Sequence, residues 1–232
     1  MAEPRRRGGL RLAAWLALAL ALLPVGGVLV HAVAPPPVTL LMLQRTLEGE
    51  GLDYRWRSLD RISPHLADAV IAAEDARFCS HAGFDLEAIR RALRENGAGR
   101  RLRGGSTLSQ QTAKNVFLWP GRGWIRKGLE AGYTVLIEAL WSKERILEVY
   151  LNVAEWGPGV YGAEAAAQHW FGKGADALTP REAARLAAIL PSPRRYRAAS
   201  PGPYVRRRAA SVQAAMGTVR RDGLSACIAS QG

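Results

Sequence analysis

The feature that most constrains this chain is an uncharged run near its N-terminus. Residues 12–34, from Leu12 to Ala34, are 23 residues without an aspartate, glutamate, lysine or arginine. As a helix at about 1.5 Å per residue, the run would extend roughly 34 Å, enough to cross a bilayer. Residues 1–11 carry four arginines against Glu3, whereas residues 35–60 carry three arginines against four acidic residues. Because positive charge stays on the cytoplasmic side, the pattern predicts a cytoplasmic basic tail (1–11), a transmembrane signal-anchor helix (12–34) and an exported remainder.

The alternative to an anchor is a cleavable signal peptide. Residues 32–34, Ala-Val-Ala, resemble the small-x-small pattern that precedes a cleavage site. Three prolines follow directly at positions 35–37, and the apolar run is longer than an ordinary signal core. Both features favour the uncleaved anchor.

The net charge points to an anionic partner. Lysine and arginine total 32 against 20 acidic residues, a formal charge of +12 with a pI near 10.6. Such a balance suits nucleic acid or an anionic lipid surface, and the apolar run favours the lipid surface. The four histidines and two cysteines lack the ligand spacing of a zinc site, and the sequence leaves open whether Cys79 and Cys227 are free or bridged.

Beyond the anchor the patterning is helical. Apolar residues recur near period 3.6 around Leu66–Ala73, Leu86–Leu93 and Val135–Leu151, and strand-like alternation is nearly absent. Ser63-Pro64, Ser106-Thr107 and Thr179-Pro180 mark helix starts. We expect a linker or pre-domain segment at 35–60 and one mainly α domain at 61–232, whose Arg206–Arg208 run and following segment form a solvated terminal helix.

Two adjacent carboxylates, Glu74 and Asp75, follow an apolar helical stretch. An apolar wall raises the pKa of a carboxyl group towards neutrality, the condition for a general acid or base. The alternative is that Glu74 or Asp75 pairs with Arg77 at the surface. His81 is by itself more typical of a structural histidine than of a catalyst.

A second cluster, residues 104–115, reads Gly-Gly-Ser-Thr-Leu-Ser-Gln-Gln-Thr-Ala-Lys-Asn. A helix capped by Ser106 or Thr107 would place Gln110 or Gln111 and Lys114 on one face. The glycines would let an anion approach the first helical turn, although the same sequence also suits an ordinary turn and cap.

A third cluster combines aromatic and basic residues around Arg122, Arg126, Lys127 and Glu130. Arg126 and Glu130 suit a helical ion pair, and the tryptophans nearby suit a lipid headgroup boundary. Two separated carboxylates with a cationic, hydroxyl-rich face indicate glycosyl chemistry on a phosphorylated substrate.

Together these clusters resemble the family 51 glycosyltransferases, the peptidoglycan polymerases, and most closely the monofunctional biosynthetic transglycosylases. The family pattern Glu-Asp-x-x-Phe-x-x-His-x-Gly is matched at 74–83, and Gly-Gly-Ser-Thr-x-x-Gln-Gln-x-x-Lys-Asn at 104–115. Arg-Lys-x-x-Glu is matched at 126–130, and Lys-x-x-Ile-Leu-Glu-x-Tyr-Leu-Asn at 143–152. The chain departs from the usual pattern with Ser109 where threonine is commoner and with Cys79 after the motif's phenylalanine.

The resemblance implies a lysozyme-like, mainly α glycosyltransferase domain behind a single N-terminal transmembrane helix. It implies polymerisation of lipid II into β-1,4-linked GlcNAc-MurNAc strands, with release of undecaprenyl diphosphate by an inverting single displacement. The location implied is the bacterial inner membrane, with the N-terminus cytoplasmic and the catalytic domain periplasmic. Lipid II, the nascent glycan strand, the membrane and cell-wall synthesis or division proteins are the implied partners, and nucleic acid is not.

The resemblance also assigns roles to residues. Glu74 is the implied general base, and Glu130 orients donor-site groups or helps to hold a divalent cation. The implied substrate-binding residues are Ser106, Thr107, Gln110, Gln111, Lys114, Asn115, Arg122, Arg126, Lys127 and Asn152. In the 143–152 motif we expect helix packing for all but Asn152. Mg²⁺ or Mn²⁺ at the diphosphate is the expected cofactor, with no organic cofactor.

Two further expectations concern activities. The residues three before the four lysines are not serine, so the Ser-x-x-Lys nucleophile of bifunctional relatives is missing and no transpeptidase activity is expected. A lytic transglycosylase or muramidase would share the fold and the catalytic glutamate, but would not need the cationic clusters. A membrane-anchored scaffold or nucleic-acid binder would tolerate Glu74→Gln.

Overall fold

The computed structural model describes residue 15 and residues 22–90, 105–121 and 123–228. In this part of the chain the structure is mainly helical, as predicted. Residues 22–33 and 86–90 are helical. The longer helices are α2 (Leu40–Leu47), α3 (Pro64–Glu74), α5 (Leu108–Phe117), α6 (Trp124–Leu140), α7 (Lys143–Val153), α8 (Ala163–Phe171), α9 (Pro180–Ile189) and α10 (Pro203–Arg221). Four single-turn 3₁₀ helices join them: η1 (Leu59–Arg61), η2 (Phe78–Ser80), η3 (Ala175–Ala177) and η4 (Ala226–Ile228).

The predicted helix starts are confirmed. Ser63 precedes Pro64 at the first position of α3, and Thr179 caps α9 in a capping box with Glu182. Thr107, rather than Ser106, is the N-cap of α5, and its capping box is closed by Gln110.

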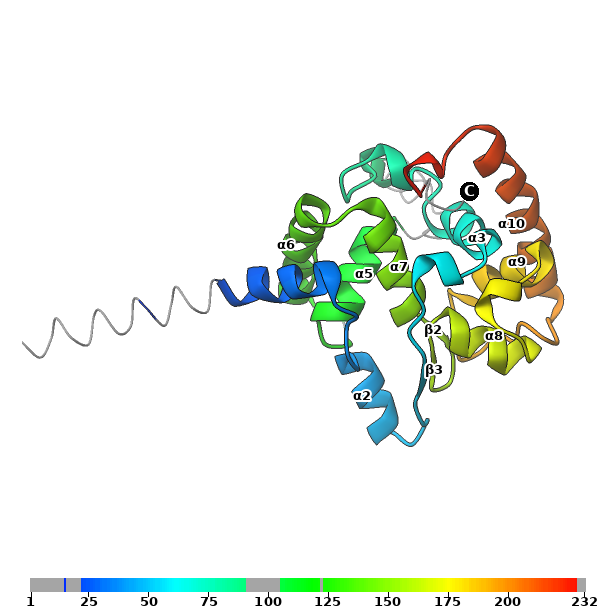
Figure 1. Ribbon diagram of the computed structural model, residues 1–232, viewed down its shortest axis with the longest axis horizontal. Coiled ribbons are helices and arrows are strands. Elements are labelled where there is room, and N and C mark those ends of the chain that lie inside the picture. The colour runs from blue at the N-terminus through cyan, green and yellow to red at the C-terminus, as the bar shows by residue number, and fades with distance from the viewer. Residues whose placement is uncertain (1–14, 16–21, 91–104, 122, 229–232) are drawn as a thin grey trace, which may run out of the picture.

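The helices form two packed groups. α3, α9 and α10 pack against one another, and α5 packs against α6 and α7. Figure 1 shows α2, α5 and α6 on the side of the N-terminal helix, and α8, α9 and α10 at the opposite end. α7 lies between the groups, with Leu147, Tyr150 and Leu151 buried in the common core as predicted.

A small sheet, which the patterning did not predict, accompanies the helices. Its strands β1 (Asp53–Tyr54), β2 (Glu155–Gly157) and β3 (Val160–Tyr161) are ordered β1-β3-β2. β1 pairs in parallel with β3, placing Asp53 opposite Val160, and β2 pairs antiparallel to β3. Strands of two or three residues are too short for an alternating pattern to be visible in the sequence.

Residues 35–60, expected as a linker or pre-domain segment, pack against the helical domain. Met42 of α2 is buried in the core, and β1 supplies an edge of the sheet. The Tyr54 hydroxyl donates a hydrogen bond to the Pro36 carbonyl at 2.7 Å. The described core therefore begins before residue 61.

The expectation of a solvated terminal helix is wrong for one face of α10. Val205, Ala209, Val212, Met216 and Val219 are buried at helical spacing against α3 and α9. The neighbouring arginines masked this apolar stripe in the sequence.

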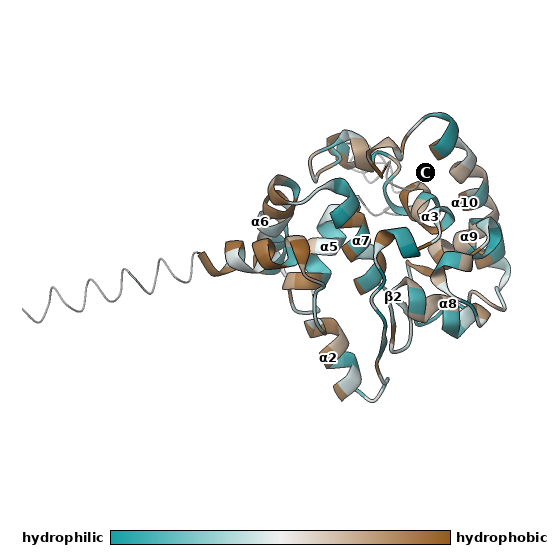
Figure 2. Ribbon diagram, viewed as in Figure 1, coloured by the Kyte–Doolittle hydropathy of each residue, from teal (hydrophilic) through white to brown (hydrophobic). Residues whose placement is uncertain are grey.

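The predicted anchor lies partly outside the described residues, which include 15 and 22–34 of it. Helix 22–33 exposes several large apolar side chains, among them Leu23 and Val33, and is mostly brown in Figure 2. Its other face packs on the domain: Trp141 donates its indole N–H to the Val28 carbonyl at 2.8 Å. Within the described residues, no helix has the length and apolarity needed to cross a membrane.

Candidate active site

Glu74 lines a cavity beside the predicted motifs. Glu74 is the last residue of α3, and the next residue, Asp75, leaves the helical conformation. The cavity has a volume of about 550 Å³ and brings together α3, the start of α5 and α10. Its lining residues are Ala73, Glu74, Ser106, Gln111, Pro191, Tyr204 and Arg208.

The side chain of Glu74 is partly buried and has polar partners. Its side chain is 16% exposed, and it accepts a hydrogen bond from the Gln111 amide at 3.1 Å. Arg208 forms an ion pair with it at 3.4 Å. Burial raises the pKa of Glu74, while Gln111, Arg208 and the more distant Lys114 oppose the rise and Asp75 adds to it. The environment therefore moves this carboxyl group towards the range in which it can both lose and regain a proton near neutral pH.

Arg77 is not the partner of these carboxylates. It forms ion pairs with Asp85 at 3.8 Å and with Glu87. The surface-pair alternative for Glu74 and Asp75 is therefore wrong.

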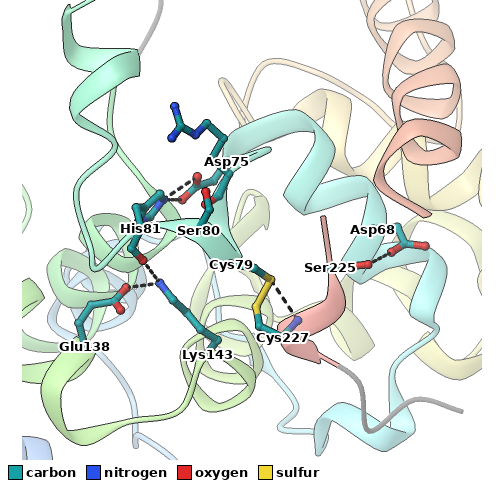
Figure 3. The surroundings of a disulfide bond; sticks show 10 residues. Asp68, Asp75, Cys79, Ser80, His81, Glu138, Lys143, Ser225 and Cys227 are labelled. Atoms are coloured by element: carbon teal, nitrogen blue, oxygen red, sulfur yellow. Dashed lines mark hydrogen bonds and ion pairs between the residues drawn. A yellow bond between two sulfur atoms is a disulfide. The ribbon is translucent and has the colours of Figure 1, made fainter. Parts of the chain in front are cut away.

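Asp75 makes positioning contacts, and it also lines a small pocket next to Glu74. One of its oxygens accepts the Leu108 backbone N–H at 2.9 Å, at the first turn of α5. The same carboxylate is 2.9 Å from the His81 Nε2 atom, and Figure 3 shows the two side chains facing each other. Asp75 thus joins the end of α3, the loop around η2 and the start of α5.

Thr107 and Gln110 fix the start of α5. The Thr107 hydroxyl donates to the Gly83 carbonyl at 2.6 Å, and Gln110 Oε1 accepts the Thr107 backbone N–H at 3.0 Å. Gly83 adopts a φ of +87°, and a Cβ there would lie 2.7 Å from the Thr134 methyl group, so a glycine is required. Both Thr107 and Gln110 are buried. They hold the motif in shape, whereas Ser106 and Gln111 reach the cavity.

A second cavity of about 300 Å³ lies further along α5. It is lined by Leu41, Lys114, Asn115, Leu118, Trp119, Pro120, Gly121 and Arg126. Burial lowers the pKa of Lys114, while the charges of Glu130 and Glu74 oppose the fall. α5 therefore carries Gln111 to the Glu74 cavity and Lys114 to a cavity lined by both cationic and apolar residues.

Glu130 is buried among cations. It forms ion pairs with Arg126 at 3.4 Å and with Lys127, and Lys114 interacts with its charge. The Mg²⁺ or Mn²⁺ expected at the diphosphate stays a prediction, because such an ion is commonly held by one or two carboxylates together with substrate phosphates. Within the described residues, no group of three acidic, histidine or cysteine side chains could hold a metal ion. Arg122, the remaining predicted cation, lies outside the described residues.

Asn152, predicted to bind substrate, is not among the residues lining either cavity. It is fully buried, and its amide oxygen accepts the Arg57 backbone N–H at 2.8 Å. Its nitrogen donates to the Arg57 and Glu148 carbonyls. These contacts join α7 to the segment that follows β1, and the role of Asn152 in binding substrate stays a prediction.

Arg208 and Tyr204 are the cavity residues that sequence reasoning missed. They lie four residues apart on α10, and both line the Glu74 cavity. The apolar stripe of α10 could have indicated these two residues, because residues that flank a buried stripe lie close to the neighbouring elements.

The comparisons with known proteins agree with this geometry. The family described as Transglycosylase matches residues 42–217. The biosynthetic peptidoglycan transglycosylase of Caulobacter vibrioides is 59% identical over 206 residues, covering 89% of this chain and 90% of the relative. The proteins of that name from Rhodospirillum centenum and Xanthomonas campestris are 57% and 56% identical, covering 94% and 90% of this chain and 94% and 89% of each relative. The chain therefore belongs to the transglycosylase family, and it is an enzyme of the glycosyltransferase class.

Proposed function

We propose that this enzyme polymerises lipid II into β-1,4-linked GlcNAc-MurNAc strands and releases undecaprenyl diphosphate. The observation that carries the proposal is the placement of Glu74. It is a partly buried carboxylate with a raised pKa at a cavity of about 550 Å³, and the adjoining helix α5 leads to a cavity with cationic residues in its lining. A single displacement with a diphosphate leaving group requires one general base and a nearby region that binds the anion.

In the proposed reaction Glu74 is the general base. Its carboxylate takes the proton from the 4-hydroxyl of the GlcNAc of an incoming lipid II. The oxygen attacks the anomeric carbon of the terminal MurNAc of the growing strand, and the bond from that carbon to the diphosphate oxygen breaks. Attack opposite the leaving group converts an α linkage into a β linkage.

The leaving diphosphate is placed at the second cavity. Lys114 and Arg126 line this cavity, and Lys127 shares their partner Glu130. Cations held in a partly buried site stabilise the charge that develops on the leaving oxygen. Arg122 joins this group on the strength of the sequence motif, and Glu130 is proposed to orient the cations. No step is assigned to a metal.

Gln111 and Arg208 are proposed to position Glu74. The Tyr150 hydroxyl donates a hydrogen bond to Gln111 Oε1 at 3.3 Å, and this bond orients the Gln111 amide. Gln111 and Arg208 both stabilise the ionised carboxylate. They keep Glu74 available as a base while burial keeps it basic enough to accept a proton.

The apolar side of the second cavity suits the polyprenyl chain. Leu41, Leu118 and Trp119 line it, and exposed apolar side chains lie nearby on α2 and at the start of α6, where Trp124 is 92% exposed. We propose that this end of the molecule meets the outer face of the bacterial inner membrane, with residues 12–34 as the anchor. The absence of a Ser-x-x-Lys motif supports a polymerase without transpeptidase activity.

The test uses detergent-solubilised full-length protein with labelled lipid II. We expect long glycan chains that a muramidase digests. Shortening of preformed glycan without new polymer would instead identify a lytic enzyme, and no reaction on either substrate would contradict the proposal.

A further inference from the structure

Loop 75–83, from Asp75 to Gly83, follows Glu74 in the chain and is hydrogen-bonded to the start of α5. Apart from the single turn η2, this loop has no regular structure. Two hydrogen bonds hold the loop to the start of α5. The Leu108 backbone N–H donates to the Asp75 carboxylate, and the Thr107 hydroxyl donates to the Gly83 carbonyl. Lys143 adds a bond from its ammonium group to the His81 carbonyl at 2.7 Å. The loop therefore sets the distance between Glu74 and the first turn of α5.

A disulfide bond also holds the loop, at η2. Cys79 of η2 and Cys227 of η4 form a disulfide across 148 residues, with Cα atoms 5.5 Å apart. Figure 3 shows this bond beside the Asp75–His81 pair and the Lys143 contact. The disulfide, the Asp75–His81 pair and the Lys143 contact therefore all hold the same loop.

The C-terminal segment also contacts the chain before Glu74. Asp68 of α3 accepts a hydrogen bond from Arg220 at 2.6 Å and from the Ser225 hydroxyl at 3.3 Å. Residues 220–228 therefore contact α3, which precedes Asp75 in the chain, and η2, which follows it. The contact to α3 is polar and partly exposed, whereas the contact to η2 is covalent.

We propose that the Cys79–Cys227 disulfide is a positioning element of the active site, fixing loop 75–83, and through it the start of α5, relative to Glu74. The role of Glu74 in this inference rests on the proposed function. Opening the disulfide leaves loop 75–83 held only by its hydrogen bonds to α5 and Lys143. Ser106 and Gln111 then sample positions further from Glu74, which becomes more hydrated. Misplacement of about 1 Å at a reacting group can cost a hundredfold in rate.

The chain is well suited to a direct test because Cys79 and Cys227 are its only cysteines. A dithiol such as dithiothreitol acts on this bond alone: it is oxidised to its cyclic disulfide, and Cys79 and Cys227 each become a thiol. The wild type is compared before and after reduction with Cys79→Ser, Cys227→Ser and the double variant. Ser225→Ala is the matched control, because it weakens the same segment's hold on Asp68 but leaves the disulfide.

We expect reduction to lower kcat on lipid II by about ten- to hundredfold, and the three cysteine variants to share the lower rate. Dithiothreitol should not change the double variant, and Ser225→Ala should stay within about twofold of the wild type. The acid limb of the rate profile should move to lower pH on reduction, because a more hydrated Glu74 loses the burial that raises its pKa. A purely structural bond would not move this limb in protein that stays folded.

Hydrogen exchange at the Leu108 amide supplies a readout that does not depend on activity. We expect faster exchange there after reduction, at a temperature where circular dichroism shows a folded chain. An unchanged rate, pH profile and exchange in the reduced protein would overturn the inference while leaving the proposed function intact. An oxidised wild type that makes no polymer would instead overturn the proposed function.

Discussion

At the scale of single residues, Glu74 combines two opposing influences. Burial disfavours its charge, and Gln111 and Arg208 favour it, with burial the larger effect. A carboxyl group with an ordinary pKa is a weak base at neutral pH, and one that stays protonated there cannot act as a base at all. The surroundings of Glu74 raise its pKa from the ordinary value, which makes its carboxylate a stronger base than an exposed glutamate.

The first prediction concerns the pH dependence of the wild type. The base form of Glu74 is required, so the rate should rise with pH through the pKa of this group. Because burial raises that pKa above its usual value of 4.5, the acid limb of kcat/KM should lie above the range of an exposed glutamate. Initial rates on lipid II between about pH 4 and pH 9 test this. An acid limb at or below pH 4.5 would contradict the burial argument.

The second prediction concerns Arg208. Arg208→Gln removes a cation that favours the ionised form of Glu74, so the acid limb should move to higher pH. The shift should be at most about one pH unit, because the Arg208 side chain is 29% exposed and the ion pair is partly screened. Arg207→Gln, at an exposed neighbour on the same helix, is the control and should leave the limb in place. A limb that moves equally in both variants would indicate a general charge effect.

At the scale of elements, the helix starts were predicted from the sequence because capping is local chemistry. Thr107 and Thr179 satisfy backbone N–H groups within their own first turn, and neither needs the rest of the fold for this. The face presented by α5 was predicted less well. Gln110 turns back to the cap and Gln111 reaches Glu74, a choice that depends on where α3 lies.

The third prediction separates a cap that only stabilises from one that also positions. Thr107→Ala should lower the free energy of unfolding by about 1–2 kcal/mol, because it removes a cap and leaves the buried Gly83 carbonyl without its donor. Thr179→Ala should cost about 1 kcal/mol and is the matched control. Denaturant titration measures both. Only Thr107→Ala should also lower the polymerisation rate, and equal rates in the two variants would place the α5 cap outside the active site.

At the scale of the whole molecule, the mainly α architecture and the family were accessible from the sequence, because period and motif spacing are local. The sheet and the pairing of Cys79 with Cys227 were not. Each depends on segments far apart in the chain: Asp53 reaches Val160, and Cys79 reaches Cys227 across 148 residues. The lysozyme-like fold and the anchor at 12–34 stay predictions.

The fourth prediction concerns global stability. The disulfide closes a loop of 148 residues, and a bond of this kind constrains the unfolded chain strongly. The double variant Cys79→Ser, Cys227→Ser should therefore lose about 2–5 kcal/mol in the free energy of unfolding. Thermal unfolding of oxidised and reduced wild type gives the same comparison without mutation. Equal midpoints would show that the bond does not constrain the unfolded state.

The account's central claim is that Glu74 is the base of a polymerising glycosyltransferase, and Glu74→Gln tests it most directly. The substitution keeps the shape of the side chain and removes the base, so kcat on lipid II should fall by about 10²–10⁴-fold. The variant should unfold at the same or a higher temperature at pH 7, because a buried charge whose pKa is raised costs stability once it is ionised. Glu182→Gln, at the α9 cap, is the control for a glutamate outside the cavity. Loss of polymer in folded Glu74→Gln with retention in Glu182→Gln is the predicted result, and wild-type polymerisation by Glu74→Gln would contradict the account.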